Sequence, residues 1–311
     1  MVADLSQELS YELISGDSSL VIGAGTQYIV DDLDISPGEI RVNDTAAPRE
    51  DGVNFGRDRF GGQLITFSII INEPPYVVEP YPIGKARFDV PGPLEPYAAL
   101  RRAWRADAVR NTSGAVSTLR MRRGGRVRRV FGRPRRAVPA PEKARAGWIS
   151  VECEFQCKDD LFYEDFEHSN QVTIVPPEAG GYLTPVLDPW VSIGTSFAPG
   201  VVHIGGDDPA WLCFKINGPI VRPVVEVVGH WAIGLNLSLR DGEWVGIDAR
   251  PWSRGIRSIY GANLGGVLVP GSPRLSDVRL NPGSYEIVLR GTDETGTASM
   301  SVAWRESYLS Q

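Results

Sequence analysis

The sequence predicts a mainly β protein that is divided into two domains. Its 311 residues include 34 glycines and 24 prolines, which form turns between short strands and interrupt helices. Segments in which apolar and polar residues alternate recur along the chain, whereas only one segment has helical spacing. Apolar residues make up 42% and charged residues 23% of the chain, a balance typical of globular domains with a buried core.

The first ninety residues are predicted to form strands joined by turns and by one long loop. Four segments are rich in β-branched and aromatic residues and are bounded by turn-forming residues. These segments are 10–16, 18–25, 26–36 and 63–74. Between the third and the fourth lies a stretch with many turn formers, GEIRVNDTAAPREDGVNFGRDRFGG, residues 38–62. A loop of this length is uncommon in a compact domain, so we expect it to carry function or to be covered by another surface.

One helix and one long hairpin are predicted in the middle of the first domain. At about residues 93–109, apolar side chains recur at helical spacing and give one face for packing. The positions are Leu94, Tyr97, Leu100 or Arg101, Trp104 and Ala108. At about residues 116–132, two strands are predicted to turn at Gly124 and Gly125, because glycine pairs allow the positive φ of tight hairpins. The alternating segment 148–157 predicts a further strand, followed by an acidic and aromatic loop.

A domain boundary is predicted in the polar, Pro- and Gly-rich segment 165–181. We therefore divide the chain into a first domain at 1–170 and a second at 171–311. In the second domain, short strands are separated by turn signals every eight to twelve residues or so, which is typical of a β-sandwich.

Three segments of the second domain resemble the C-terminal domain of distal tail proteins of long-tailed, siphovirus-type bacteriophages. They are FKINGPIVRPVVEVVGH, LSLRDGEWVGIDARPWSRGI and LNPGSYEIVLRGTDETGTASMSVAWRESY. In the first domain, GQLITFSIII and WISVECEFQCKDDLFYED are similar to the ladder strands and the following loop of that family's ring-forming domain. The loop departs from the family pattern, because CKDDLFY lacks its proline.

The resemblance implies a structural protein with no enzymatic activity. The first domain would form a ring, usually of six copies, that joins the tail tube to the tail tip. The second would be a galectin-like β-sandwich that docks neighbouring tip proteins. Implied partners are further copies of the chain, the tail tube protein, the tape measure and the tip or hub proteins, with DNA passing transiently. The implied location is the tail tip of the virion, after assembly in the host cytoplasm.

Two further features agree with synthesis in a cytoplasm and with no membrane partner. The segment MVADLSQELSYELISG is acidic and lacks the apolar run of a secretory signal. The longest apolar stretches, such as 64–71, have the length of a strand and are too short to span a bilayer.

A strongly basic segment coincides with the predicted hairpin. Residues 101–136 hold thirteen arginines and one acidic residue, whereas residues 1–60 hold twelve acidic residues and four arginines. Nine of these arginines are candidates for a subunit interface: Arg120, Arg122, Arg123, Arg126, Arg128, Arg129, Arg133, Arg135 and Arg136.

Three interpretations of the basic segment remain open. The hairpin is solvated or paired within the chain, it contacts a neighbouring subunit or tail component, or it binds nucleic acid. Arginine suits all three, because its planar guanidinium pairs with carboxylate and phosphate alike. We favour the subunit contact, since no nucleic-acid-binding module is recognisable and a strongly basic channel would retard DNA through phosphate pairing.

The sequence predicts no catalytic, cofactor-binding or metal site. His168, His203 and His230 are far apart in the sequence and lack ligand partners at metal spacing. Cys153 and Cys157 lie four residues apart on a predicted strand, about 13 Å, which is too far for a disulfide.

Two alternative functions stay open at this point. In the first, the β-sandwich of a related minor tail protein binds a host-surface glycan through its tryptophans, which are Trp190, Trp211, Trp231, Trp244 and Trp252. Fold resemblance by itself does not transfer such binding. In the second, the chain is a cell-wall hydrolase that uses a carboxylate pair such as Asp159 and Asp160.

Overall fold

The chain folds into two compact units, each of which is described here by itself. The computed structural model describes residues 9–47, 49, 51–72, 94–140, 148–174 and 200–311. One unit comprises Met1–Asp165 and Leu309–Gln311, and the other comprises Phe166–Tyr308. The division lies five residues before the boundary predicted at 170, because the first strand of the second unit, β13 (His168–Thr173), begins inside the segment predicted as a linker.

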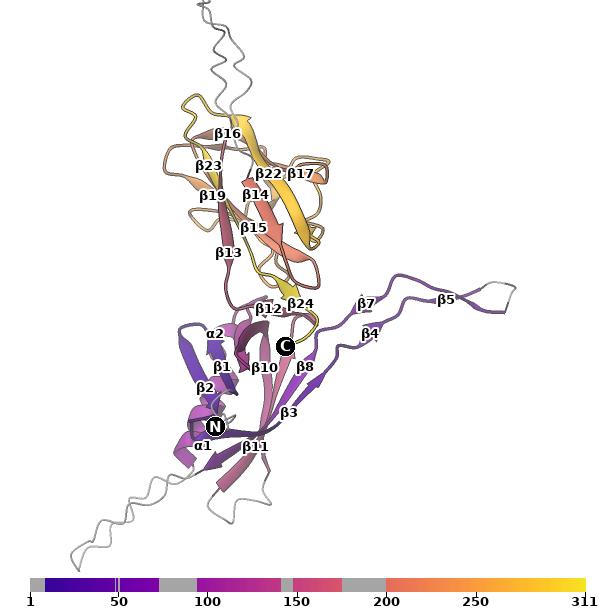
Figure 1. Ribbon diagram of the computed structural model, residues 1–311, viewed down its shortest axis with the longest axis vertical. Helices are drawn as coiled ribbons and strands as arrows, with labels where there is room; N and C mark the ends of the chain where they lie inside the picture. The colour runs from indigo at the N-terminus through magenta and orange to yellow at the C-terminus, as the bar shows by residue number, and fades with distance from the viewer. Residues whose placement is uncertain (1–8, 48, 50, 73–93, 141–147, 175–199) are drawn as a thin grey trace, which may run out of the picture. The chain divides into compact units, whose positions relative to one another are not determined.

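The first unit is built on one curved antiparallel sheet (Figure 1). Its strands are β1 (Ser10–Ser15), β2 (Ser18–Gly23), β3 (Tyr28–Ser36), β8 (Leu64–Asn72), β9 (Ser117–Arg123), β10 (Arg126–Ala140), β11 (Trp148–Cys157) and β12 (Phe162–Glu164). The order across the sheet is β2-β1-β9-β10-β11-β8-β3, and β12 pairs with β10. Strand β3 therefore forms one edge of the sheet, and the predicted strands of the first domain are all present.

A helix packs on this sheet and closes the core of the first unit. Helix α1 (Leu94–Arg105) buries Leu100 and Trp104. The Trp104 ring meets Phe67 edge-on with 6.1 Å between centroids, and its indole N–H donates to the carbonyl oxygen of Glu154 at 3.0 Å. The hydroxyl of Tyr28 donates to the carbonyl oxygen of Pro96 at 3.0 Å. The helix is therefore tied to strands β8, β11 and β3.

The predicted single helix is two helices in the structure. The backbone adopts a left-handed conformation at Ala106, with φ 47° and ψ 49°, and the short helix α2 (Asp107–Arg110) follows. This break shifts the inward face by one position. Val109 is buried and Ala108 is exposed, the reverse of the prediction from unbroken helical spacing. The predicted start at residue 93 lies outside the described residues.

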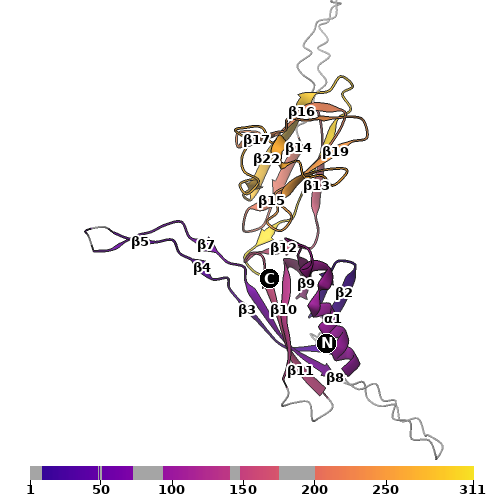
Figure 2. The same cartoon turned by 180° about the vertical axis from the view of Figure 1, so that it is seen from behind.

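The segment predicted as a long loop forms an extended two-stranded ribbon. It consists of β4 (Ile40–Arg41) with β7 (Arg59–Phe60), then β5 (Thr45–Ala46) with β6 (Val53–Asn54). We call residues 37–62 the arm. It continues the β3–β8 hairpin away from the sheet, and in both views no other described element of the first unit lies beside it (Figures 1 and 2).

The second unit is a sandwich of two antiparallel sheets. One has the order β13-β23-β15-β19-β20 with β21 beside β15, and the other has the order β14-β22-β16-β17 with β18 beside β16. The remaining bounds are β14 (Gly200–Ile204), β15 (Ala210–Asn217), β16 (Ile220–Val227), β17 (Trp231–Gly234), β18 (Ser238–Leu239), β19 (Trp244–Asp248), β20 (Gly255–Ser258), η3 (Gly265–Val267), β21 (Arg279–Leu280), β22 (Gly283–Thr292), β23 (Ser299–Trp304) and β24 (Ser307–Tyr308).

Alternation along these strands supplies the sandwich core. In β15, Ala210, Leu212, Phe214 and Ile216 are buried and the residues between them are more exposed. This is the pattern expected when one face of each sheet packs against the other sheet. The mainly β fold class is confirmed. No helix among the described residues is long and apolar enough to cross a membrane.

Candidate subunit interface

The basic hairpin, β9 and β10, turns where the glycine pair predicts. Gly124 and Gly125 have φ values of 54° and 75°, the positive values that a tight two-residue turn requires. The register places Arg120 opposite Arg129 and Arg123 opposite Arg126. Like charges directly across a ladder repel each other, so each pair is stable only where an anion neutralises it or solvent screens it.

At the base of the hairpin, the like-charged pair is neutralised within the chain. Arg120 donates two hydrogen bonds to the carboxylate of Asp165, at 2.8 and 2.7 Å, and a third to Oε2 of Glu12 at 2.8 Å. Arg129 donates to Oδ1 of the same Asp165. Burial would raise the pKa of Asp165, but the hydrogen bonds from Arg120 and Arg129 outweigh it and hold that pKa below its ordinary value. These two arginines therefore serve the fold of the first unit.

Two further candidates also bind their own chain. Arg133 donates to the carbonyl oxygens of Ala115 and Thr112, both at 2.7 Å, and so fixes the chain that follows α2. Arg136 lies 3.3 Å from Glu154 in an exposed ion pair, an arrangement that contributes little to stability.

The tip of the hairpin presents arginines that are open to another molecule. Arg122, Arg123 and Arg126 are exposed, and we call them the tip arginines. Arg123 reaches Oε1 of Gln311 at 3.4 Å. Within the described part of the chain, the side chains of Arg122 and Arg126 have neither an ion pair nor a hydrogen bond. Arg135 is exposed in the same way, whereas Arg128 is half-buried.

The acidic residues of the first unit divide in a similar manner. Glu12 is half-buried against Arg120. Asp31, Asp32 and Asp34 are exposed on the edge strand β3. The opposite charges seen in the sequence are thus partly matched inside one chain and partly displayed on its surface.

Asp159 is enclosed at the point where the arm joins the sheet. Its Oδ2 accepts a hydrogen bond from the Tyr163 hydroxyl at 2.7 Å. Its backbone carbonyl oxygen accepts a hydrogen bond from the backbone N–H of Gln63 at 3.1 Å. Its Oδ1 is shielded from solvent and accepts no hydrogen bond within the described residues. Burial raises the pKa of this carboxyl to about 6. Such a shift also marks catalytic acids, but the contacts of Asp159 hold Tyr163 and the start of β8 in place.

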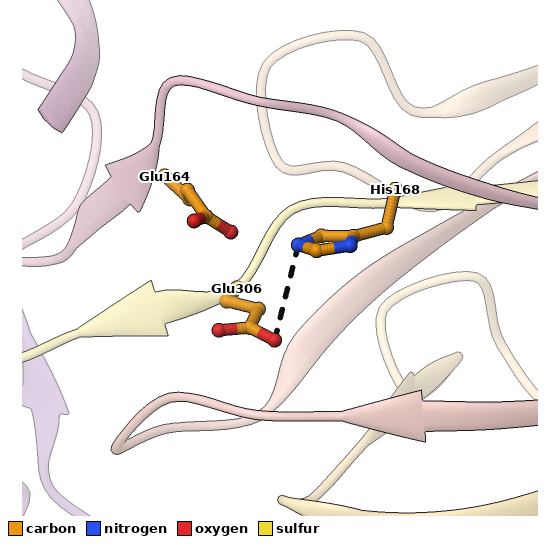
Figure 3. A group of neighbouring side chains, drawn as sticks. All are labelled: Glu164, His168 and Glu306. Atoms are coloured by element: carbon orange, nitrogen blue, oxygen red, sulfur yellow. Dashed lines mark ion pairs between the residues drawn. The ribbon is translucent and has the colours of Figure 1, made fainter. Parts of the chain in front are cut away.

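The three histidines make separate contacts in the second unit. His168 Nε2 lies 3.8 Å from Oε1 of Glu306 (Figure 3), and the His168 ring stacks on Trp304 with 5.4 Å between centroids. His203 shares a hydrogen bond with Ser284, and His230 meets the ring of Tyr285. In the first unit, Cys153 and Cys157 are free and buried, and burial raises the pKa of both thiols.

Cationic side chains lie over two of the tryptophans named as possible glycan contacts. The guanidinium groups of Arg254 and Arg279 lie 5.4 and 5.6 Å from the ring of Trp211. The ammonium group of Lys215 lies 4.9 Å from the ring of Trp244. Trp231 meets Phe214 edge-on at the core and Trp252 is half-buried, while Trp190 lies outside the described residues.

Sequence reasoning missed the exposed residues of the arm. Ile40 and Arg41 in β4 face Phe60 and Arg59 in β7. The sequence holds only a short signal, because Ile40–Arg41 and Arg59–Phe60 place one apolar and one basic residue in mirrored order. Two such dipeptides are too short to predict a hairpin when many turn formers lie between them.

Three solved structures resemble the chain along almost its whole length. The SPP1 Dit protein, described as a paradigm of the hub adsorption apparatus in phages that infect Gram-positive bacteria, is 11% identical with a TM-score of 0.52, over 96% of this chain and 98% of that one. A chain of the phage p2 baseplate in its activated conformation with Sr is 12% identical with a TM-score of 0.50, over 95% and 97%. The same baseplate with Ca gives 11%, 0.50, 95% and 97%.

Neither a protein-family model nor a curated protein matches the sequence. At such low identity, the structural likeness establishes architecture and no more. It extends over both units, since nearly all of each chain is covered. The chain therefore shares its fold with phage hub and baseplate proteins.

Proposed function

We propose that this chain is a structural component of a phage tail tip, a distal tail protein. Six copies form a ring that joins the tail tube to the tip or baseplate proteins. The observation that carries the proposal is the fold shared with SPP1 Dit over 96% of this chain and 98% of that one. The similarity of the sequence segments in the second domain to distal tail proteins supports the same assignment.

In this function the first unit closes the ring and the second unit docks neighbouring tip proteins. A ring of identical subunits needs two different patches on each copy, joined head to tail. The tip arginines form one charged patch that is open to carboxylates of a neighbouring subunit or tail component. The chain acts through such surfaces, at the tip of the virion, and DNA passes through the ring only transiently.

Negative-stain microscopy of the purified full-length chain, combined with native mass spectrometry, tests the proposal. We expect particles with six-fold symmetry and a central opening, and a mass of six chains of 34.0 kDa each. A chain that remains a monomer at every concentration, also when it is mixed with tail tube protein, would contradict the ring.

Replacing Arg122 and Arg126 with serine is expected to reduce ring assembly while the chain remains folded. Both side chains are exposed, so the fold loses no internal contact with them, whereas an interface loses two guanidinium groups. The fraction of chains in rings, measured by native mass spectrometry, checks this result. Arg240→Ser with Arg257→Ser is the matched control, because both arginines are exposed and lie in the second unit. Unchanged assembly by the Arg122→Ser, Arg126→Ser variant would remove the tip arginines from the interface.

A further inference from the structure

The arm exposes an unusual amount of apolar surface for a two-stranded ribbon. Five of its apolar side chains are between 51% and 88% exposed: Ile40, Val42, Val53, Phe55 and Phe60. An isolated two-stranded hairpin is marginally stable in water, and it gains independent stability by packing against a further layer. Exposed apolar groups gathered on one element mark a surface that another molecule covers.

The register of the arm separates an apolar face from a cationic one. Ile40 pairs with Phe60 across the ribbon, and the next pair is Arg41 with Arg59. Successive side chains point to opposite faces of a strand, so the two pairs lie on opposite sides. Arg41 and Arg59 are like charges directly across the ladder, a destabilising arrangement unless an anion lies against them. Among the described residues, neither of the two arginine side chains has an ion pair or a hydrogen bond.

The edge strand β3 offers a surface of matching chemistry. Ile29 is 44% exposed, and beside it Asp31, Asp32 and Asp34 are exposed as well. Asp31 lies where the β3–β8 ladder is irregular. The side-chain hydrogen bonds of Asp32 and Asp34 are local, to the amide of Leu33 and to the hydroxyl of Ser36. Three exposed carboxylates and one apolar side chain are therefore available to meet a ribbon that carries arginines and apolar residues.

The arm cannot use the acidic edge of its own chain in this way. Arg41 lies seven positions after Asp34, about 23 Å in an extended strand, and the ribbon runs away from the sheet (Figures 1 and 2). A nucleic acid is a poor occupant, because residues 37–62 hold five acidic residues against four arginines, and these carboxylates would repel the phosphates that arginines attract. The charge pattern fits a protein surface that displays both carboxylates and apolar side chains.

We propose that the arm docks on the edge strand β3 of a second copy of this chain. Arg41 and Arg59 meet the carboxylates of Asp31 and Asp34 there, and Ile40 and Phe60 are covered by the same neighbour. The contact is head to tail, since the arm and the β3 edge are different surfaces, and such a contact closes into a ring when the rotation permits. This assignment rests on the proposed function and identifies the surfaces that join its subunits.

Serine substitutions at Ile40 and Phe60 test the apolar face. In the full-length chain we expect the concentration at which half of the chains are assembled to rise by at least about tenfold, as for loss of a central interface contact. Val201→Ser with Val228→Ser is the matched control, because these valines of the second unit are 64% and 42% exposed. The control is expected to assemble like the wild type. Circular dichroism of the monomers checks that both variants are folded.

Charge reversal in two separate chains tests the pairing directly. A chain with Arg41→Glu and Arg59→Glu repels the acidic edge of its own kind, and a chain with Asp31→Arg and Asp34→Arg repels the cationic arm of its own kind. Each is expected to remain unassembled alone. When the two chains are mixed, the acidic arm of the first variant meets the basic β3 edge of the second. The basic arm of the second variant meets the acidic β3 edge of the first, which is the native pairing. The mixture is therefore expected to form rings that contain both chains in equal number, visible by native mass spectrometry.

Three results would overturn the proposal, and they separate it from the function above. If the wild type forms rings and the serine variant assembles normally, the arm is not part of the interface, and the tail-ring function still stands. If the wild type forms rings but the folded charge variants fail to assemble when mixed, the arm does not pair with the β3 edge, and the tail-ring function again still stands. A wild-type chain that never assembles would contradict both the arm contact and the ring.

Discussion

Replacing Trp104 with alanine is expected to destabilise the first unit by about 3–5 kcal/mol. Trp104 is 2% exposed and packs against Phe67. The substitution leaves a cavity between α1 and the sheet, and it leaves the carbonyl oxygen of Glu154 without its indole donor. Urea unfolding of the full-length chain measures the effect, with exposure of the buried thiols of Cys153 and Cys157 as the signal for the first unit.

Tyr97→Ala provides the comparison for this prediction. Tyr97 lies on the same helix but is half-buried, so its loss is expected to cost clearly less than that of Trp104, about 1 kcal/mol. In the same experiment, thiol labelling at Cys213 reports unfolding of the second unit. The unfolding free energy of the second unit should be unchanged in both variants. Equal destabilisation by the two substitutions would mean that Trp104 is not the anchor of α1 on the sheet.

Asp159 is expected to make the first unit less stable as the pH rises from 4 to 7. Its pKa in the folded chain is raised from 3.8 to about 6 by burial. Because the folded state holds the proton more tightly than the unfolded state, the stabilising contribution is complete below pH 3.8 and is lost as the pH rises through 6. The difference corresponds to about 3 kcal/mol. Asp159→Asn should remove this loss, since an amide does not titrate.

The pH dependence is measured as the difference between wild type and variant. Urea unfolding at pH 4, 5, 6 and 7, read at Cys153 and Cys157, gives the unfolding free energy of the first unit for each chain. Asp160→Asn is the control, because it removes the neighbouring carboxylate and leaves Asp159 in place. The wild type and Asp160→Asn should both lose stability toward pH 7. A parallel course for wild type and Asp159→Asn would show that Asp159 does not titrate in this range.

Strand patterns in this sequence predict much of the fold because they depend on neighbours along the chain. Alternation in 10–16 and 148–157 yields β1 and β11, and the pair Gly124–Gly125 fixes the turn of the basic hairpin. The break of the helix at Ala106 has no such local signal, because alanine favours helices. There, tertiary packing of Trp104 and Val109 against the sheet overrides the local preference.

The candidate interface was predictable only in part, for a related reason. Alternation along β9 directs Leu119 and Met121 inward and therefore Arg120 and Arg122 outward. Which of the two arginines is neutralised depends on Asp165, which is 45 residues away from Arg120 in the sequence. No pattern within the hairpin contains that information. Local spacing places a charge on a face, and only the folded chain shows whether that charge is already matched.

Residues 309–311 belong to the first unit, so the sandwich is inserted between two segments of that unit in the sequence. The side-chain amide of Gln311 donates to Sδ of Met121 at 3.1 Å, and Arg123 donates to Oε1 of Gln311 at 3.4 Å. Exchange of the sandwich for another domain would therefore need two junctions, one after Asp165 and one before Leu309. A fragment that stops at Asp165 would lack the residue that contacts Met121 and Arg123, and it would present an altered hairpin tip in any assembly assay.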